Sequence, residues 1–361
     1  MNNITMLQLK NTISSYQKII EEALSKFFDE KTEKYSKISP LAKEMIGSLE
    51  EFTLRGGKRI RPILTIFGYK AISGTDNPSI TEAALAVELM ESFLLIHDDI
   101  LDQDDFRRGH YSMHKLYELN AKKLYPPSNT KHFGSSMAIM AGDLLSVLGS
   151  EVITSSSFPD DLKIKAIDKF NRVIINTIFG QIMDFVSELN PEVSELDILR
   201  INELKTAIYT IEGPLHIGAI LAGASQTQLD RLTRYAIPLG QAYQIYDDIL
   251  GMFGDEKKLG KPIGSDLKEG KKTILILKTL QLANAQQMKT ITRMLGNKSL
   301  TNTQIDEVRK IIIETGSLDY SKALVKELTE KAKSYLQYSD FKQEGKEFLL
   351  SLADYMVDRE K

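Results

Sequence analysis

Three carboxylates end an apolar, helix-like run between residues 93 and 102. Asp98 and Asp102 are four residues apart, so on a helix they lie one above the other on one face, whereas Asp99 points about 100° away. Stacked like charges repel each other, and a hard cation with oxygen ligands relieves that repulsion. Mg²⁺ usually takes one or two carboxylates and completes its shell with water and substrate phosphates. Asp98 and Asp102 therefore predict half of a magnesium–phosphate site.

Two adjacent arginines, Arg107 and Arg108, follow this acidic run. Their planar guanidinium groups are suited to forked hydrogen bonds with phosphate oxygens. Carboxylates followed by cations favour diphosphate binding over the simpler alternative, a helix end with a solvated acidic patch. We interpret His97, next to Asp98, as a packed or hydrogen-bonded helix residue and not as a catalytic base.

A second acidic pair, Asp247 and Asp248, also follows an apolar helical run. Gln244 shares a helix face with the pair because it lies three and four residues before it. The irregular stretch 254–270 comes next, and a loop of that length in a compact domain usually has a function. Its glycines would let lysines such as Lys261 fold back over an anion. The alternative is a charged surface loop.

A basic turn near the start of the chain is a third candidate for anion binding. Four cations fall within residues 55–61, beside Gly56 and Gly57. The glycines would let backbone N–H groups approach an oxyanion, and Pro62 suits the first turn of a helix, whose N-terminus attracts phosphate. The spacing around Lys58 does not match a P-loop, which also needs a preceding strand. In isolation, the alternative is a basic surface turn.

The elements that must position these residues are helices. Apolar residues recur at helical spacing over residues 164–186, 198–222, 236–253 and 304–328. We find no convincing period-two alternation bounded by turn residues. We therefore predict an all-α fold, a single large helical bundle over residues 1–361 with a central active-site cavity.

Bulk composition narrows the classes of function. A net charge of −3 gives no sign of a nucleic-acid surface, and the lack of cysteine excludes disulfides, zinc–thiolate sites and a cysteine nucleophile. The first residues do not resemble a signal peptide, and the apolar runs are far shorter than the roughly 20 residues of a membrane span. We expect a cytoplasmic protein without a transmembrane segment.

Taken in order, these motifs resemble those of the trans-isoprenyl diphosphate synthases, the group of farnesyl and geranylgeranyl diphosphate synthases. The resemblance covers residues 54–273, more than half of the chain. Besides the basic turn and both acidic motifs, it includes four further segments, at residues 180–184, 205–206, 260–266 and 270–273.

Two positions depart from the family pattern. Gly251 stands where many members have a third aspartate of the second motif, so that motif would depend mainly on Asp247. Glu91 stands where many members have His or Gln in contact with isopentenyl diphosphate. An anionic Glu91 would be repelled by that ligand unless it is protonated or paired with Lys58 or Arg61.

The resemblance implies a magnesium-dependent enzyme that joins isopentenyl diphosphate to an allylic diphosphate. Three Mg²⁺ ions would bind the allylic diphosphate, two of them through Asp98 and Asp102 and the third through Asp247. The positive charges would let the carbon–oxygen bond ionise to an allylic cation, which isopentenyl diphosphate attacks. The family is generally dimeric, which implies a homodimer.

The resemblance also implies roles for residues that bind the substrates. Arg107, Lys205 and Lys261 would cap the departing diphosphate, and Gly57, Lys58, Arg61 and Arg108 would hold isopentenyl diphosphate. Thr206, Gln244 and Lys271 complete the implied substrate-binding set, and Asp99, Asp248, Gln181 and Asp184 are further candidates.

The helix before the first acidic motif bears on product length. Leu94, Phe93 and Met90 lie four, five and eight residues before Asp98, which is roughly 6, 7.5 and 12 Å along a helix. Phe93 would be the first bulky residue below the growing chain. By the family pattern, one aromatic here and no insertion in the acidic motif imply a C20 product, geranylgeranyl diphosphate, with C15 farnesyl diphosphate as the alternative.

Three other functions would leave a different set of motifs from that of an active synthase. A terpene cyclase of the same fold would need only the first acidic motif, and a non-catalytic partner subunit of a heteromeric synthase would lack one or both motifs. A plain helical scaffold gives no reason for three separate anion sites. Because the chain keeps both motifs and the basic turn, the sequence favours the active enzyme.

Overall fold

The structure is a computed structural model that describes residues 5–124, 129–190, 192–256 and 263–357, and the chain divides into two compact units. We name one the α4 unit, after the helix that carries the first acidic motif; it comprises Leu7–Phe170 and Pro214–Gly223. The other, the α10 unit, comprises residues 5–6, residues 171–213 and the described part of 224–361. The predicted single domain with a central cavity depends on how the two units combine, and it stays a prediction.

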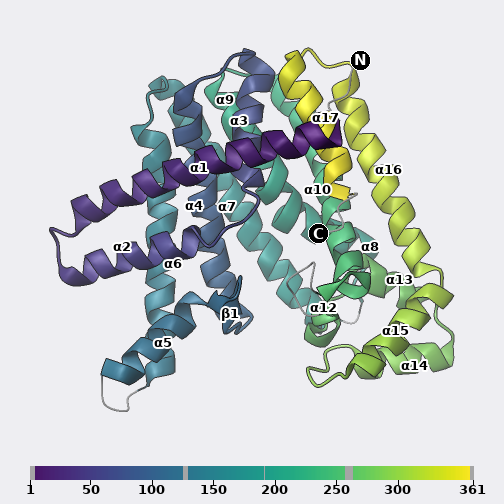
Figure 1. The fold of residues 1–361 in the computed structure, drawn as a ribbon. Coiled ribbons are helices and arrows are strands. Elements are labelled where there is room, and N and C mark those ends of the chain that lie inside the picture. Colours follow the sequence, from purple (N-terminus) through teal and green to yellow (C-terminus); the bar gives the residue numbers. More distant parts are fainter. Residues whose placement is uncertain (1–4, 125–128, 191, 257–262, 358–361) are drawn as a thin grey trace. The chain divides into compact units, whose positions relative to one another are not determined.

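The α4 unit is built from helices and one short hairpin. Its elements are α1 (Met6–Tyr35), α2 (Pro40–Thr53), α3 (Ile60–Ser73), α4 (Pro78–Leu101), β1 (Phe106–Arg107), β2 (His110–Tyr111), α5 (Met113–Leu124), α6 (Thr130–Ser155), the first part of α7 (Asp160–Leu189) and most of α9 (Gly213–Leu221). Helices α1 and α2 form a helical hairpin (Figure 1).

Helix α4 is the interior helix of this unit and packs against α3 and α6. It starts where the side chain of Asn77 accepts a hydrogen bond from the backbone N–H of Ser79 and Pro78 takes the first helical position. Leu85, Leu89 and the residues around them are buried along most of its length, so α4 lacks a polar face. Its C-terminal end therefore places the first acidic motif on a rigid, well-packed support.

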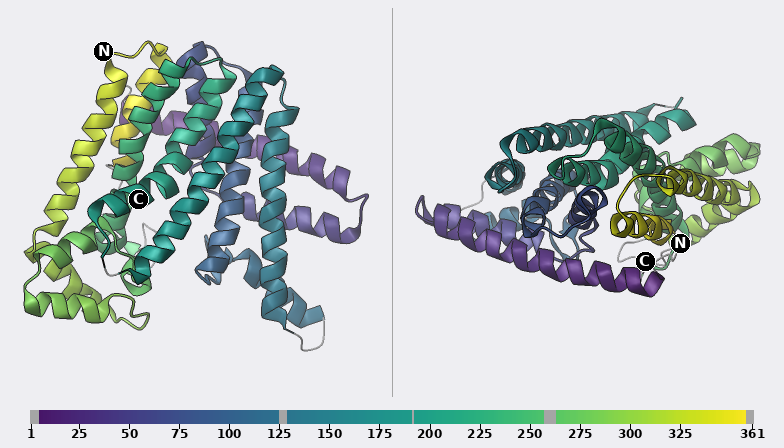
Figure 2. Two further views of the ribbon diagram at one scale, coloured as in Figure 1. Left: turned by 180° about the vertical axis from the view of Figure 1, so that it is seen from behind. Right: turned by 90° about the horizontal axis from the view of Figure 1, so that it is seen from above.

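The α10 unit contains the remaining helices. Besides the end of α7, its elements are α8 (Glu195–Asn202), the π-helix η1 (Glu203–Glu212), α10 (Gln226–Phe253), α12 (Ser265–Glu269), α13 (Ile274–Leu282), α14 (Ala285–Met294), α15 (Asn302–Glu314), α16 (Ser317–Gln337) and α17 (Gln343–Val357). Helix α10 packs against α16 and η1, and α14 and α15 lie at one end of α16 (Figures 1 and 2).

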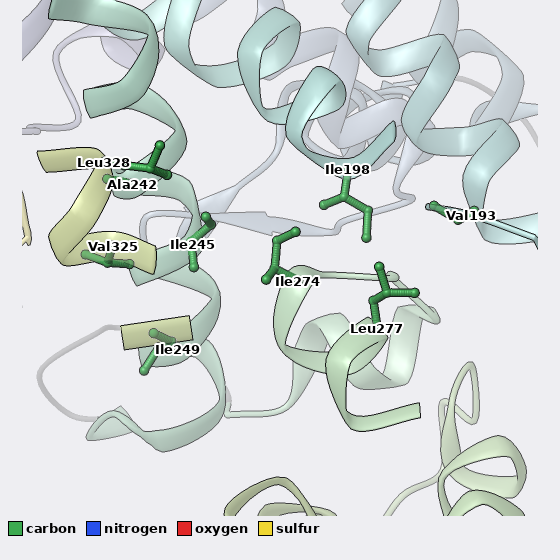
Figure 3. Packing of buried hydrophobic residues seen from close by; sticks show 9 residues of the cluster. All are labelled: Val193, Ile198, Ala242, Ile245, Ile249, Ile274, Leu277, Val325 and Leu328. Atoms are coloured by element: carbon green, nitrogen blue, oxygen red, sulfur yellow. The ribbon is translucent and has the colours of Figure 1, made fainter. Parts of the chain in front are cut away.

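One face of α10 is held by a buried apolar cluster. Ala242, Ile245 and Ile249 lie on this face, with Val325 and Leu328 of α16 beside them (Figure 3). Burying each large aliphatic side chain contributes about 1.5–3 kcal/mol. The cluster therefore fixes the rotation of α10 about its axis, and this rotation turns Gln244 and Asp248 toward η1.

The all-α prediction is confirmed, with three local corrections. The predicted helix 304–328 is wrong as a single element, because Gly316 adopts a left-handed φ of 74° and separates α15 from α16. Residues 265–269, predicted to be irregular, form α12 between the left-handed glycines Gly264 and Gly270. The predicted helix 198–222 contains the π-helical segment η1. Within the described residues, β1 and β2 are the only strands.

Helix α6 is the one described helix that is long and apolar enough to cross a membrane. Half of its most apolar window is buried inside the protein, and core helices of water-soluble proteins share this length and composition. Length and composition therefore do not mark α6 as a membrane span.

Candidate active site

The first acidic motif forms the last turn of α4, where burial separates the roles of adjacent aspartates. Asp99 is fully buried, and its Oδ1 accepts a hydrogen bond of 2.6 Å from Nε of Arg107, which also donates through Nη2. Asp98 is half-buried, with its Oδ2 3.5 Å from Nη2 of Arg107. Asp102 is half-buried at the end of the helix. Asp99 thus anchors Arg107, and Asp98 and Asp102 keep partly accessible carboxylates one helical turn apart.

A two-residue hairpin turn delivers the arginine pair. Strands β1 and β2 pair with Arg107 opposite His110, and the turn residues Arg108 and Gly109 have φ values of 53° and 78°. A two-residue loop with positive φ at both positions is a type I′ turn, whose twist matches that of the strands. The turn separates the arginines, so that Arg107 contacts the acidic motif and Arg108 contacts the basic turn.

The basic turn uses its cations in different ways. Arg59 is 3% exposed and is paired with the buried Glu88, so it belongs to the interior and does not form part of an exposed anion site. Arg55 donates to both carboxylate oxygens of Glu51. The helix α3 begins directly after Arg59, and Lys58 is exposed. The four cations that lie close together in the sequence therefore do not form one continuous anion-binding surface.

Glu91 pairs with two of the arginines predicted to hold isopentenyl diphosphate. Its Oε2 accepts a 2.8 Å hydrogen bond from Nη1 of Arg61, and its Oε1 lies 3.4 Å from Nη2 of Arg108. Nη1 of Arg108 also donates to the backbone oxygen of Gly56. A Cβ atom on Gly57 would lie 3.2 Å from the guanidinium of Arg108, so glycine at this position leaves room for that group. Of the alternatives that the sequence left open for Glu91, pairing with Arg61 is observed, and Arg108 is a second partner.

Burial raises the pKa of Asp99 from 3.8 to about 6, because the effect of desolvation exceeds the opposing effect of Arg107. Its Oδ2 atom is buried and has no hydrogen-bond partner among the described residues. Because the folded state holds this proton more tightly than the unfolded chain, the resulting stability is complete below the unfolded pKa and is lost as the pH rises through the folded pKa.

We therefore expect the free energy of unfolding of the metal-free protein to fall between about pH 4.5 and pH 6.5 as Asp99 ionises. Asn at position 99 cannot ionise, so Asp99→Asn should show a shallower decline in urea unfolding experiments across this range. A slope equal to that of the wild-type protein would contradict the assignment, and Asp161→Asn, at an exposed position on α7 in the same unit, is the control.

A pocket of about 100 Å³ within the α10 unit collects residues that the sequence placed on separate segments. Gly180 of α7 lets that helix approach η1, since a Cβ atom there would lie 2.7 Å from the backbone nitrogen of Lys205. One turn after Gly180, Asp184 accepts a 2.8 Å hydrogen bond from Nζ of Lys205. The glycine and the carboxylate, four residues apart, therefore position the lysine together.

Helix α10 also approaches η1 closely at a glycine, as α7 does at Gly180. A Cβ atom on Gly240 would lie 2.3 Å from Cα of Ala207, so only glycine permits this distance. One turn later, Oε1 of Gln244 accepts a 2.8 Å hydrogen bond from Oγ1 of Thr206, and Nε2 of Gln244 donates to Oδ1 of Asp248 at 2.8 Å. Lys205 and Thr206 thus lie on a π-helical segment held by two close-packed helices, and π-helical turns occur frequently at functional sites.

The second acidic motif gathers carboxylates around α10. Asp248 is 6% exposed, and burial, together with the charge of Asp266, raises its pKa well above the ordinary value. Asp247 is half-buried. A Cβ atom on Gly251 would lie 3.3 Å from Oδ2 of Asp266, so the carboxylate of Asp266 approaches α10 beside the position where the family pattern has a third aspartate. Such a cluster favours a bound cation or proton.

Lys272 and Asn202 are among the lining residues of this pocket that the predicted set did not include. Lys272 donates from Nζ to backbone carbonyl oxygens at the end of α7, including that of Ser187 at 2.9 Å. Asn202 is 6% exposed, and within the part of the chain that the structure describes its Nδ2 atom has no hydrogen-bond partner. No sequence motif marked Asn202, because its position on the pocket wall depends on how α8 packs. Lys272 adjoins the predicted Lys271, which pairs with Glu269 at 2.7 Å.

The remaining predicted residues have the following positions. Gln181 is half-buried on α7, and Lys261 lies outside the described residues. Met90 is fully buried and Phe93 is 6% exposed, whereas Leu94 is half-buried. The ring of Phe93 packs edge-to-face on His97, whose Nε2 lies 3.2 Å from the backbone oxygen of Ile139. His97 is therefore a packed, hydrogen-bonded residue, as interpreted from the sequence.

Comparison with known proteins identifies the family of this chain. The family model described as polyprenyl synthetase matches residues 42–312. The chain is 36% identical to a geranylgeranyl diphosphate synthase of Sulfolobus acidocaldarius, over 85% of this chain and 88% of that protein. It is 37% identical to a short chain isoprenyl diphosphate synthase of Methanocaldococcus jannaschii, over 74% and 75% of the two chains.

Among solved structures, the chain resembles geranylgeranyl pyrophosphate synthase of Corynebacterium glutamicum, a structure complexed with isoprenyl diphosphate and magnesium. The TM-score is 0.89 at 31% identity, and the match covers 95% of this chain and 98% of the other.

Proposed function

This chain belongs to the polyprenyl synthetase family and is a short-chain prenyl diphosphate synthase, and we propose that it joins isopentenyl diphosphate to an allylic diphosphate to make geranylgeranyl diphosphate. The observation that carries the proposal is the pocket of the α10 unit. Asp184, Lys205, Thr206, Gln244, Asp248 and Lys271 all line it, and the sequence had placed them on four separate segments.

The donor atoms present fit Mg²⁺. Asp98 and Asp102 offer carboxylate oxygens one turn apart, and the clustered carboxylates of Asp247, Asp248 and Asp266 would be stabilised by a cation. In the part of the chain that is described, no group of three or more His, Cys, Asp or Glu side chains is arranged so that it could hold a metal ion by itself. Mg²⁺ rarely needs one, because substrate phosphates and water complete its shell.

We assign two ions to Asp98 and Asp102 and a third to Asp247, as the resemblance to the family implies. When bound, Mg²⁺ supplies positive charge that neutralises the departing diphosphate.

The side chains of this protein supply the rest of the chemistry. Lys205 is oriented by Asp184, and Lys271 adds a second positive charge to the pocket, so both can bind the oxygens of a departing diphosphate. Thr206 and Gln244 form a hydrogen-bonded chain to Asp248, which keeps these groups oriented before the substrate arrives. In the α4 unit, Lys58, Arg61 and Arg108 would bind isopentenyl diphosphate. Ionisation of the allylic diphosphate by these positive charges requires no side-chain nucleophile.

The finer product assignment depends on α4. Phe93 is a bulky, buried residue one turn and a half before Asp98, and it would stop the growing chain at C20. C15 is the alternative. We also propose that the enzyme acts in the cytoplasm, in keeping with a chain that has no cysteine.

A homodimer is proposed because α7 exposes an apolar stripe. Ile175, Ile178, Phe179, Ile182 and Phe185 are each more than one-third exposed, at the spacing of three and four residues that forms one helical face. A second copy of the chain would cover this stripe.

Ile182→Glu should shift the mass in sedimentation velocity from twice 40.7 kDa toward 40.7 kDa, since burying an unpaired charge in an apolar interface is costly. Ile313→Glu, at a residue of similar exposure on α15, should leave the mass unchanged. A monomeric wild-type protein would contradict the proposal.

The test of the function is condensation of radiolabelled isopentenyl diphosphate with C5, C10 and C15 allylic starters, with and without Mg²⁺, followed by chain-length analysis. We expect a C20 product only when Mg²⁺ is present. A failure to condense with every starter would overturn the proposed activity, and a C15 product would overturn only the assignment of chain length.

A further inference from the structure

Glu91 introduces a negative charge into a group of residues proposed to bind an anion. It lies on α4 seven residues before Asp98, hence close to the same helix face, and is half-buried. Its two carboxylate oxygens contact different arginines, Arg61 from α3 and Arg108 from the hairpin turn. One carboxylate thus bridges two guanidinium groups that reach it from separate elements.

The side chains in this bridge are mostly withdrawn from water. The side-chain exposures are 13% for Glu91, 19% for Arg61 and 31% for Arg108. In such surroundings charges interact more strongly than in bulk solvent. Without Glu91, the guanidinium groups of Arg61 and Arg108 would lose the negative charge that both of them contact, and their mutual repulsion would be less compensated. The carboxylate therefore stabilises the ligand-free arrangement of both arginines.

An incoming diphosphate offers the same chemistry as this carboxylate, because both are anions with oxygen acceptors suited to forked guanidinium contacts. We propose that Glu91 is an internal counterion that competes with the diphosphate of isopentenyl diphosphate for Arg61 and Arg108, and so sets the affinity for this substrate. The inference rests on the proposed function, which assigns these arginines to isopentenyl diphosphate.

The direction in which Glu91→Gln should change the affinity for isopentenyl diphosphate follows from the competition between the carboxylate and the diphosphate. Glu91→Gln removes a charge that stabilises the free protein and repels the bound diphosphate. It should therefore destabilise the ligand-free protein and tighten binding, whereas a residue that only positions the arginines would weaken binding when it is changed. The two roles thus predict opposite changes in affinity.

The experiment is isothermal titration of isopentenyl diphosphate into the full chain without Mg²⁺ or allylic substrate, paired with thermal unfolding. Relative to wild type, Glu91→Gln should lower the Kd about tenfold, which is the size of one charge-assisted hydrogen bond. It should also lower the Tm of the ligand-free protein and enlarge the rise in Tm that saturating isopentenyl diphosphate produces. Glu82→Gln, an exposed glutamate of the same helix, should change neither value.

The possible results distinguish a failure of the counterion role of Glu91 from a failure of the proposed isopentenyl diphosphate site. Unchanged or weaker binding by folded Glu91→Gln, with wild-type binding intact, overturns the counterion role and leaves the proposed function in place. If the wild-type protein does not bind isopentenyl diphosphate, or if Arg61→Met binds it as well as wild type does, the assignment of this site fails and the inference fails with it.

Discussion

Asp98→Asn is expected to lower kcat/KM for the allylic diphosphate by roughly a thousandfold, while the Tm stays close to that of the wild-type protein. Losing one preorganised electrostatic contact to the transition state typically costs a factor of about 10²–10³, and a metal ligand also affects ion binding. Asp98 is half-buried, and its nearest described cation, Nη2 of Arg107, is 3.5 Å away, so the folded state depends little on its charge. The residual activity should require a higher concentration of Mg²⁺.

The adjacent Asp99 provides a matched comparison for this prediction. Asp99→Asn removes the buried partner of Arg107, so it should change the pH dependence of stability as well as activity. Steady-state kinetics over a range of Mg²⁺ concentrations, with thermal unfolding of both variants, would separate the two residues. If Asp98→Asn kept wild-type activity, or if it lost activity only because it unfolded, the assignment of Asp98 to the metal would be wrong.

Phe93→Ala should lengthen the product from C20 to C25 or beyond. Phe93 is a bulky, almost fully buried residue before the acidic motif, and removing its ring opens space below a growing chain. Truncating a buried Phe to Ala usually costs about 3–5 kcal/mol, so the Tm should fall as well. Chromatography of dephosphorylated products formed from the C15 starter would measure the change in length.

Leu49→Ala is the packing control for this variant. Leu49 is fully buried in α2, so its truncation should also lower the Tm, but the product should remain C20. Phe93→Leu should give an intermediate mixture, because its side chain is smaller than Phe and larger than Ala. An unchanged product spectrum in folded Phe93→Ala would show that another residue limits the chain.

Local spacing was sufficient to propose most of the candidate site. Asp98 and Asp102 are recognisable because residues four apart on any helix share a face. The helical period likewise indicated an all-α fold. It did not reveal where Gly316 divides α15 from α16, because a left-handed glycine does not interrupt the apolar pattern. The type I′ hairpin was also missed, since its strands are only two residues long.

Residue types and helical spacings were enough to indicate which side chains could hold magnesium and diphosphate, because that chemistry depends on carboxylates and cations that lie close together along a helix. Which of these side chains are buried, and so withdrawn from such a role, depends on packing and is seen in the fold. Asp98 and Asp99 are identical in type and adjacent, and burial alone makes one accessible and the other an anchor for Arg107. Arg59 and Arg61 are likewise identical in type, but Arg59 is buried and Arg61 is only half-buried.

Which polar side chains pair with each other also depends on the tertiary structure. Glu91 and Arg61 are 30 residues apart, and Thr206 and Gln244 are 38 apart, so no local pattern specifies these contacts. They arise because buried apolar faces fix how each helix is rotated and how closely it approaches its neighbours. Periodicity is a property of residues a few positions apart, whereas burial and pairing depend on packing between elements.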